Sequence, residues 1–211
     1  MNQPEKMFIK CNNIKLEAEI FISDSQKNPI VLISHPHPQM GGSMNNNVVS
    51  GIFHFLIKKK ISSMRFNFRG VGKSTGSSIG GKTEIKDVKC TIEYLLKEKN
   101  YKKVLICGYS FGAAIGCSVV NDFDNVIGFI AISFPWDYMG RSFKRLSQTS
   151  KPKLFIQGDQ DQIASFSKFK DHYRFYDEPK QYQIIKGADH FYWGYENKVA
   201  NYVFEFYKPL A

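Results

Sequence analysis

Long apolar runs are missing from this sequence. Although 43% of its residues are hydrophobic, they never continue for the roughly 20 positions that a membrane-spanning helix requires. The first six residues, Met1-Asn2-Gln3-Pro4-Glu5-Lys6, lack the apolar stretch of a secretory signal. Repeats, low-complexity blocks and flexible linkers are missing as well. We therefore expect a single globular domain over residues 1–211, located in the cytoplasm.

Cysteine is scarce, and its spacing excludes the common metal and redox motifs. The four cysteines stand at positions 11, 90, 107 and 117, and no two of them form a C-x-x-C pair. We expect all four to be reduced thiols, as is usual in the cytoplasm. Cys107 is expected to point into a buried sheet and not to act as a nucleophile.

Acidic residues are outnumbered, since 29 Lys and Arg stand against 19 Asp and Glu and the net charge is +10. Such a charge favours encounters with anions, phospholipid surfaces or nucleic acid. The basic residues are dispersed, however, and no basic tract interleaved with aromatic residues marks a nucleic-acid module. We expect a small-molecule or acyl-group substrate, with an anionic or membrane-proximal one as an option, and no specific nucleic-acid partner. The sequence contains no signal for an oligomeric state.

Strand and helix patterns alternate along the chain. An antiparallel hairpin is predicted at residues 7–11 and 15–22, with Asn12-Asn13 as its turn. The further predicted strands cover residues 30–34, 62–66, 104–107, 126–133, 154–157 and 182–185. The predicted helices cover residues 45–59, 82–97, 111–121, 162–175 and a final segment whose apolar face spans 192–206. This order predicts the α/β class, a mostly parallel sheet with helices on both faces.

The segment Gly108-Tyr109-Ser110-Phe111-Gly112 is a G-x-S-x-G motif in its characteristic setting. An apolar strand precedes it and a helix-forming run follows it. A sharp strand-to-helix reversal strains the central residue, and the flanking glycines remove the Cβ atoms that would collide. The pattern predicts Ser110 as an exposed nucleophile at the positive end of a helix. A simple turn is the alternative, since Gly and Ser are ordinary turn residues.

An acid and a base follow in the required order. Asp161 lies just beyond the predicted strand at 154–157, and His190 lies in the loop after the last predicted strand. A neutral imidazole can accept the serine proton, and a carboxylate can orient that imidazole. Asp159 is the competing acid, but it lies closer to the strand end and suits the role of bracing the turn. Alternatively, Asp161 is a helix cap and His190 a surface residue.

Three further segments carry a resemblance to a known family. They are His35-Pro36-His37-Pro38 after the strand at 30–34, Gly41-Gly42-Ser43-Met44-Asn45-Asn46, and the stretch 65–74, which has the pattern R-x-N-x-R-G-x-G-x-S. Together with the G-x-S-x-G motif, they make the chain similar to the α/β-hydrolase superfamily over residues 30–206. It resembles in particular the small, lidless, dienelactone-hydrolase-like branch. The resemblance implies an α/β-hydrolase fold and a Ser-His-Asp triad.

The His-Pro-His-Pro run predicts one half of an oxyanion hole, which needs main-chain N–H groups aimed at the developing charge. Proline has no N–H, so among residues 36–38 only His37 can donate. We expect the main-chain amides of His37 and Phe111 to form the hole, Phe111 being the residue after the nucleophile. Zinc binding by His35 and His37 is a weaker alternative, because no Cys or carboxylate cluster accompanies them.

Two other segments border the expected site. Gly72-Lys73-Ser74 lacks the upstream glycine of a phosphate-binding loop, since position 67 is Asn, and we interpret residues 69–76 as a structural turn. Residues 134–150 stand where larger relatives insert a lid. There we expect Trp136 and Met139 to line a substrate pocket; the alternative is that Trp136 and Tyr138 only cover the end of the sheet.

These patterns predict a serine hydrolase that cleaves a carboxylic ester or thioester through an acyl-enzyme. Ser110 attacks, His190 transfers the proton and Asp161 orients His190, with no metal and no organic cofactor. Two alternatives remain: an amidase, peptidase or acyltransferase that uses the same serine, and a non-catalytic scaffold with the same fold.

Overall fold

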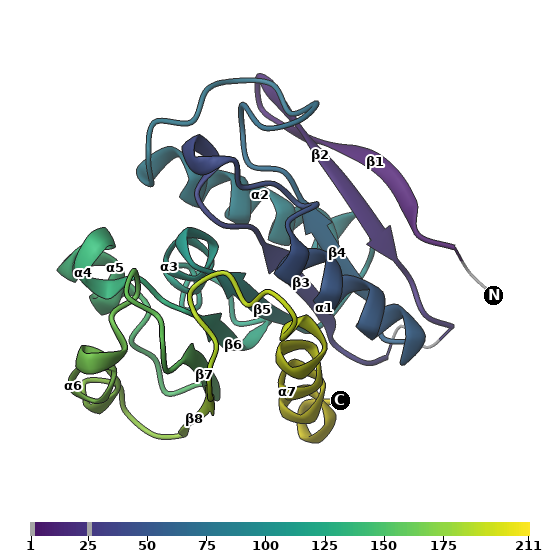
Figure 1. Cartoon of the computed structure of the whole chain (residues 1–211). Coiled ribbons are helices and arrows are strands. Elements are labelled where there is room, and N and C mark those ends of the chain that lie inside the picture. The colour runs from purple at the N-terminus through teal and green to yellow at the C-terminus, as the bar shows by residue number, and fades with distance from the viewer. Residues whose placement is uncertain (1–2, 25–26) are drawn as a thin grey trace.

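The computed structural model describes residues 3–24 and 27–211 and is built around one eight-stranded sheet (Figure 1). The strands are β1 (Glu5–Cys11), β2 (Ile14–Phe21), β3 (Ile30–Ser34), β4 (Ser63–Phe66), β5 (Val104–Tyr109), β6 (Val126–Ile132), β7 (Lys153–Gly158) and β8 (Lys180–Ile185). The helices are α1 (Asn47–Lys58), α2 (Lys82–Lys97), α3 (Phe111–Cys117), α4 (Trp136–Met139), α5 (Arg141–Leu146), α6 (Phe169–Arg174) and α7 (Glu196–Tyr207). Short 3-10 turns are η1 (Pro38–Met40), η2 (Phe166–Lys168) and η3 (Lys208–Leu210).

The strand order is β1-β2-β4-β3-β5-β6-β7-β8. β2 pairs antiparallel with both β1 and β4, and all pairs from β4 to β8 are parallel. The carboxyl ends of the parallel strands therefore meet at one edge, where open α/β sheets bind their ligands. The predicted hairpin and the mostly parallel α/β sheet are confirmed.

The sheet is covered on both faces because side chains alternate along each strand. In β3, Ile30 and Leu32 join a core with α2 and α3, whereas Val31 and Ile33 join a second core with α1 and α7. Figure 1 shows α1 and α7 next to each other in front of the sheet. All five positions of β3 are buried, as expected for a central parallel strand with helices on both sides.

Helix boundaries differ from the sequence-based expectation at three places. The helix after Ser110 ends at Cys117, where the next side chain, Ser118, donates a hydrogen bond to the Ile115 carbonyl at 2.7 Å and competes with helix continuation. The region 162–175 forms only η2 and α6. The final helix begins at Glu196, because Tyr192 and Gly194 have left-handed backbone, with φ of 56° and 81°, which a right-handed helix excludes.

The cysteine prediction is wrong for one pair. Cys11 in β1 and Cys90 in α2 form a disulfide with a Cα–Cα distance of 5.9 Å. The two residues are 79 positions apart, so their pairing depends on how α2 packs beside the edge strand. Four reduced thiols would have supported the expected cytoplasmic location, and the disulfide removes that support. Cys107 and Cys117 are free and buried, and burial raises the pKa of the Cys107 thiol, which keeps it un-ionised.

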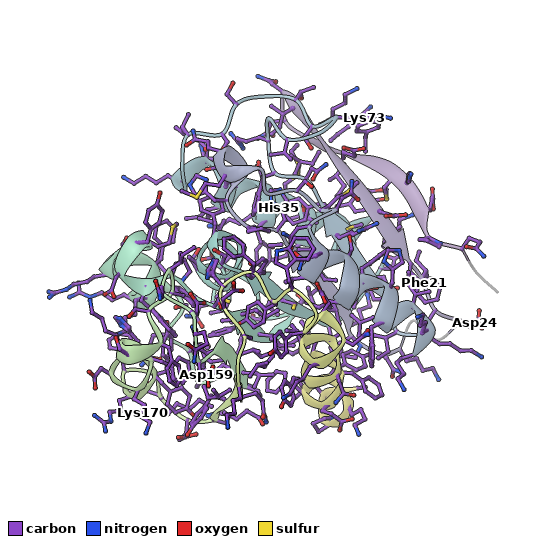
Figure 2. The ribbon with its side chains drawn as sticks, in the orientation of Figure 1. Phe21, Asp24, His35, Lys73, Asp159 and Lys170 are labelled. Atoms are coloured by element: carbon purple, nitrogen blue, oxygen red, sulfur yellow. A yellow bond between two sulfur atoms is a disulfide. The ribbon has the colours of Figure 1, made fainter. Side chains whose placement is uncertain are left out.

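Residues 69–76 form a turn that side chains hold in place. Glu17 Oε2 accepts hydrogen bonds from Asn67 Nδ2 and from the Lys73 main-chain N–H, both at 2.8 Å. The guanidinium of Arg69 pairs with Asp87 in the second turn of α2, with Nε donating to Oδ1 at 3.0 Å. Figure 2 shows Lys73 at the outer edge of the molecule. These contacts explain the polar composition of the turn.

The connection between β6 and β7 is short. Within the described ranges 3–24 and 27–211, only α4 and α5 lie in this connection, and no lid covers the carboxyl edge of the sheet. None of the helices in the same ranges has both the length and the apolar character to cross a membrane.

Candidate active site

Ser110 lies at the tip of the turn that joins β5 to α3. Its backbone is left-handed, with φ of 55° and ψ of −120°. A Cβ at Gly108 would lie 2.4 Å from the Gly112 carbonyl oxygen, and one at Gly112 would lie 2.4 Å from the Ser34 carbonyl oxygen. Both positions therefore require glycine, because real Cβ atoms do not approach that closely. The glycines let α3 pack against the end of β3 and place Ser110 at the sheet edge, where it is buried but lines a cavity.

The three residues predicted for a triad come together from the loops after β5, β7 and β8. The Oγ atom of Ser110 lies 2.8 Å from Nε2 of His190. Nδ1 of His190 lies 2.9 Å from Oδ2 and 3.1 Å from Oδ1 of Asp161. All three side chains are buried or nearly so. This arrangement allows the imidazole to accept the Ser110 proton while Asp161 holds its opposite nitrogen.

Asp161 is held as an acceptor by its own loop. Its Oδ1 accepts hydrogen bonds from the main-chain N–H groups of Ile163, at 3.0 Å, and Ala164, at 2.8 Å. Asp159 has a different partner: its Oδ1 accepts from the Gly187 main-chain N–H at 2.7 Å. Asp159 therefore joins the turn after β7 to the turn after β8, and Asp161 is the carboxylate in contact with His190.

The main-chain N–H groups of His37 and Phe111 belong to residues that line one cavity together with Ser110. Phe111 is the first residue of α3, a position whose N–H has no partner within the helix. The two side-chain rings pack with their centroids 4.7 Å apart. Nδ1 of His37 accepts from the Gln39 N–H at 3.2 Å, which fixes the loop. Desolvation by burial lowers the pKa of His37, and the negative charge of Glu84 opposes this shift only in part.

His35, which the sequence suggested only as a weaker candidate for zinc binding, supports the loop that carries His37. The Phe68 main-chain N–H donates to Nε2 at 3.1 Å, so the ring proton is on Nδ1, which donates to the Pro36 carbonyl at 2.7 Å. Complete burial lowers its pKa to about 4. Figure 2 shows His35 near the centre of the molecule. Its place shortly after the apolar run at residues 30–33 was the available signal for burial.

Both ring nitrogens of His35 are therefore engaged in hydrogen bonds with the protein, which leaves neither free to bind zinc. In the described part of the chain, no three His, Cys, Asp or Glu side chains converge as metal ligands. The side chains of Ser110, His190 and Asp161 are instead hydrogen-bonded to one another.

A cavity of about 410 Å³ opens beside Ser110 and His190. Its apolar walls come from Pro36, Met40, Phe111, Pro135, Tyr138, Met139, Ile163 and Phe191. No Asp, Glu, Lys or Arg of the described residues lines it. Met40, Ile163 and Phe191 were missed in the sequence, because they stand on separate loops that only the fold brings together.

Of the two residues expected in the pocket, Met139 lines the cavity and Trp136 does not. Trp136 is only 4% exposed. Its Nε1 donates to the Tyr176 hydroxyl at 2.9 Å, and its ring stacks on Phe134 and on His172. The prediction for Trp136 is therefore wrong, because the first residue of α4 faces the core while Tyr138 and Met139 face the cavity.

A family model described as an α/β-hydrolase domain matches residues 27–199. The chain belongs to the α/β-hydrolase family. An uncharacterized protein of Rickettsia prowazekii, RP471, is 34% identical over 185 residues, which cover 84% of this chain and 78% of that protein. The structure of an α/β serine hydrolase homologue from Coxiella burnetii has a TM-score of 0.86 and 31% identity, with 100% of this chain and 99% of that chain covered.

The fold of this α/β hydrolase is also similar to that of XC6422 from Xanthomonas campestris, a serine hydrolase without a lid. That structure has a TM-score of 0.85 and 23% identity, with 98% of this chain and 94% of that chain covered. The resemblance to the α/β-hydrolase superfamily seen in the sequence is thus confirmed, and the family and its serine hydrolase homologues support hydrolase activity.

Proposed function

We propose that this α/β hydrolase cleaves a carboxylic ester or thioester through an acyl-enzyme. The observation that carries the proposal is the continuous hydrogen-bonded series from Ser110 Oγ through His190 to Asp161, at 2.8 Å and 2.9 Å. In the first step His190 Nε2 removes the Ser110 proton as Oγ attacks the carbonyl carbon. The bond from the carbonyl carbon to the leaving oxygen or sulfur then breaks, and the imidazolium protonates that atom, which departs as an alcohol or thiol. Water, activated by the same nitrogen, releases the acid and regenerates Ser110.

The negative oxygen of each tetrahedral intermediate is assigned to the main-chain N–H groups of His37 and Phe111. Fixed donors of this kind stabilise charge that develops only in the transition state, and they need no reorganisation during the reaction. The buried hydrogen bonds of His35 support this assignment, because they tie the His37 loop to the segment after β4.

The cavity favours an uncharged, apolar group on the substrate. Among the described residues, its lining offers no Lys or Arg to an anionic group, which argues against the anionic option raised by the net charge of +10. Four large apolar side chains at its mouth, Met40, Tyr138, Ile163 and Phe191, are at least half exposed. Clustered exposed apolar side chains mark ligand-binding surfaces. We therefore assign the cavity to an aliphatic or aromatic acyl or leaving group.

The test is labelling with a fluorophosphonate probe, followed by mapping of the modified residue by mass spectrometry. Labelling confined to Ser110 and abolished in Ser110→Ala, with heat-unfolded protein as the control, is the expected result. In a series of p-nitrophenyl esters, kcat/KM should rise about fourfold per added CH₂, or ~0.8 kcal/mol, until the cavity is full. A folded protein that is neither labelled nor active on any ester or thioester would contradict the proposal and favour a non-catalytic scaffold.

A further inference from the structure

Left-handed backbone at residues other than glycine is concentrated around the candidate active site. Within residues 3–24 and 27–211, six such residues occur. Asn12 and Asn100 have side chains that tolerate this conformation, and Lys60 follows the end of α1. The remaining three are Ser110, Ser133 and Tyr192. Strained backbone at functional sites persists where surrounding contacts hold it, so the contacts of Ser133 and Tyr192 need an explanation.

The side chains of Ser133 and Tyr192 meet behind the carboxylate of Asp161. Ser133 directly follows β6, and its Oγ donates to Asp161 Oδ2 at 2.6 Å. The Tyr192 hydroxyl lies 2.7 Å from the same Oγ. Because the single Ser133 proton goes to the carboxylate, Oγ must accept from Tyr192. The direction of donation is therefore fixed: Tyr192 to Ser133, and Ser133 to Asp161.

Both hydroxyl groups are inaccessible to solvent, and the residues are 0% exposed. Burial raises the pKa of Tyr192, and the nearby Asp161 carboxylate and Tyr109 add to the shift. The Tyr192 hydroxyl therefore remains protonated and remains a donor. The main chain of Ser133 is anchored too, since its N–H donates to the Ile156 carbonyl of β7 at 2.8 Å.

These contacts leave Asp161 with one well-defined orientation. Two main-chain N–H groups donate to Oδ1, Ser133 donates to Oδ2, and His190 Nδ1 lies 2.9 Å from Oδ2 and 3.1 Å from Oδ1. Without the Ser133 hydroxyl, Oδ2 would keep only His190 as a partner, and rotation of the carboxylate about its Cβ–Cγ bond would be opposed only by the N–H groups on Oδ1 and by the imidazole itself. Rotation would move the oxygen that holds His190 Nδ1, and with it the ring that faces Ser110.

We infer that Ser133 and Tyr192 are positioning residues, forming a two-hydroxyl relay that fixes Asp161 and, through it, the ring of His190. The inference rests on the proposed function of the Ser110–His190–Asp161 series. Neither hydroxyl contacts the cavity, so the relay acts on the geometry of the base and not on substrate binding.

The first test separates kcat from KM. Ser133→Ala should lower kcat about tenfold on the best p-nitrophenyl ester, the size of effect associated with a lost hydrogen bond to a charged group, and leave KM within about twofold. Tyr192→Phe should lower kcat by a smaller factor. Because the two hydroxyls act in series, the double variant should be no slower than Ser133→Ala.

Matched control variants distinguish the effect of losing the relay from the effect of losing any buried hydroxyl group. Ser147 is also buried and hydrogen-bonds a tyrosine, with its Oγ 2.9 Å from Tyr176 OH. Tyr207 is buried with its OH donating to the Pro29 carbonyl at 3.0 Å. Ser147→Ala and Tyr207→Phe should lose stability but keep kcat. Ser133→Gly accepts the left-handed backbone without strain, so it should show the kcat loss of Ser133→Ala even if the alanine variant folds poorly.

The second test does not depend on activity. The proton that His190 Nδ1 shares with Asp161 should give a far-downfield ¹H NMR resonance, and this resonance should shift in Ser133→Gly and Tyr192→Phe but not in the two controls. If wild-type kcat and the resonance are retained in both relay variants, the relay inference is wrong while fluorophosphonate labelling still supports the proposed function. If wild-type protein is neither labelled nor active, the proposed function fails, and an unchanged resonance would overturn the relay as well.

Discussion

The side chain of His35 accepts a hydrogen bond from the main-chain N–H of Phe68 at 3.1 Å, so a buried neutral imidazole joins the loop after β3 to the loop after β4. The same ring donates to the Pro36 carbonyl. Protonation would convert the acceptor nitrogen into a second donor facing the Phe68 N–H. The loop that carries His37 is therefore held by a group that must stay neutral.

The protein should lose stability as the pH falls below the ordinary pKa of histidine. The pKa of His35 is lowered from 6.5 to about 4, so between these values the unfolded chain binds the proton and the folded chain does not. Stability then decreases as the pH falls through this window, by about 3 kcal/mol over the full shift. Urea unfolding at pH 7, 5.5 and 4.5 measures the slope. His35→Gln, which cannot titrate, should reduce it, and an equal slope in both proteins would contradict the assignment.

Replacement of His37 by proline should impair catalysis more than replacement by alanine. The φ of His37 is −57°, which proline adopts without strain, so His37→Pro removes the N–H and largely preserves the loop. Loss of one oxyanion donor lowers kcat by about 10²- to 10³-fold, whereas His37→Ala keeps that donor and should be much milder. Steady-state kinetics on one ester compares them. Equal losses would assign the effect to the imidazole.

The two carboxylates after β7 should differ sharply in their effect on rate. Asp161→Asn places an amide against His190 Nδ1, disfavours the required tautomer and should lower kcat roughly 10³- to 10⁴-fold. Asp159→Asn should keep nearly full kcat, because Asp159 holds the Gly187 main chain and not the base. Thermal unfolding of both variants separates rate from stability. The reverse order of kcat values would move the acid to Asp159.

Local sequence was sufficient for the parts of this protein that local physics determines. The glycines around Ser110 predict a tight turn, and continuous apolar runs predict β3 to the residue and β5 apart from its last two residues. What could not be predicted depends on contacts between distant segments. Ser133 reaches Asp161 only because β6 and β7 are neighbours. Trp136 faces inward because α4 begins against Tyr176. The pairing of Cys11 with Cys90 likewise follows from helix α2 lying beside the edge strand.

Thiol counting should distinguish the paired from the free cysteines. Unfolded in denaturant without reductant, the protein should expose two reactive thiols, Cys107 and Cys117, and four after reduction. The double variant Cys11→Ser/Cys90→Ser should lose about 2 to 4 kcal/mol of unfolding free energy, because the bond limits the unfolded chain. Four reactive thiols without reductant would restore the expectation of reduced cysteines.

A substitution at Met139 tests which wall of the cavity limits the chain length of the acyl group. It lines the cavity from the end of α4, while Leu146 on the neighbouring α5 is 49% exposed and outside the cavity. Met139→Trp adds bulk inside a space of about 410 Å³. It should therefore lower kcat/KM for long-chain p-nitrophenyl esters by about tenfold or more, since each CH₂ kept in water forfeits ~0.8 kcal/mol. Hydrolysis of the acetate should change little, because the shortest acyl group stays near Ser110.

Leu146→Trp is the matched control and should leave the whole chain-length profile intact. A profile unchanged by Met139→Trp would place the acyl group elsewhere, along the Met40 and Phe191 side of the mouth.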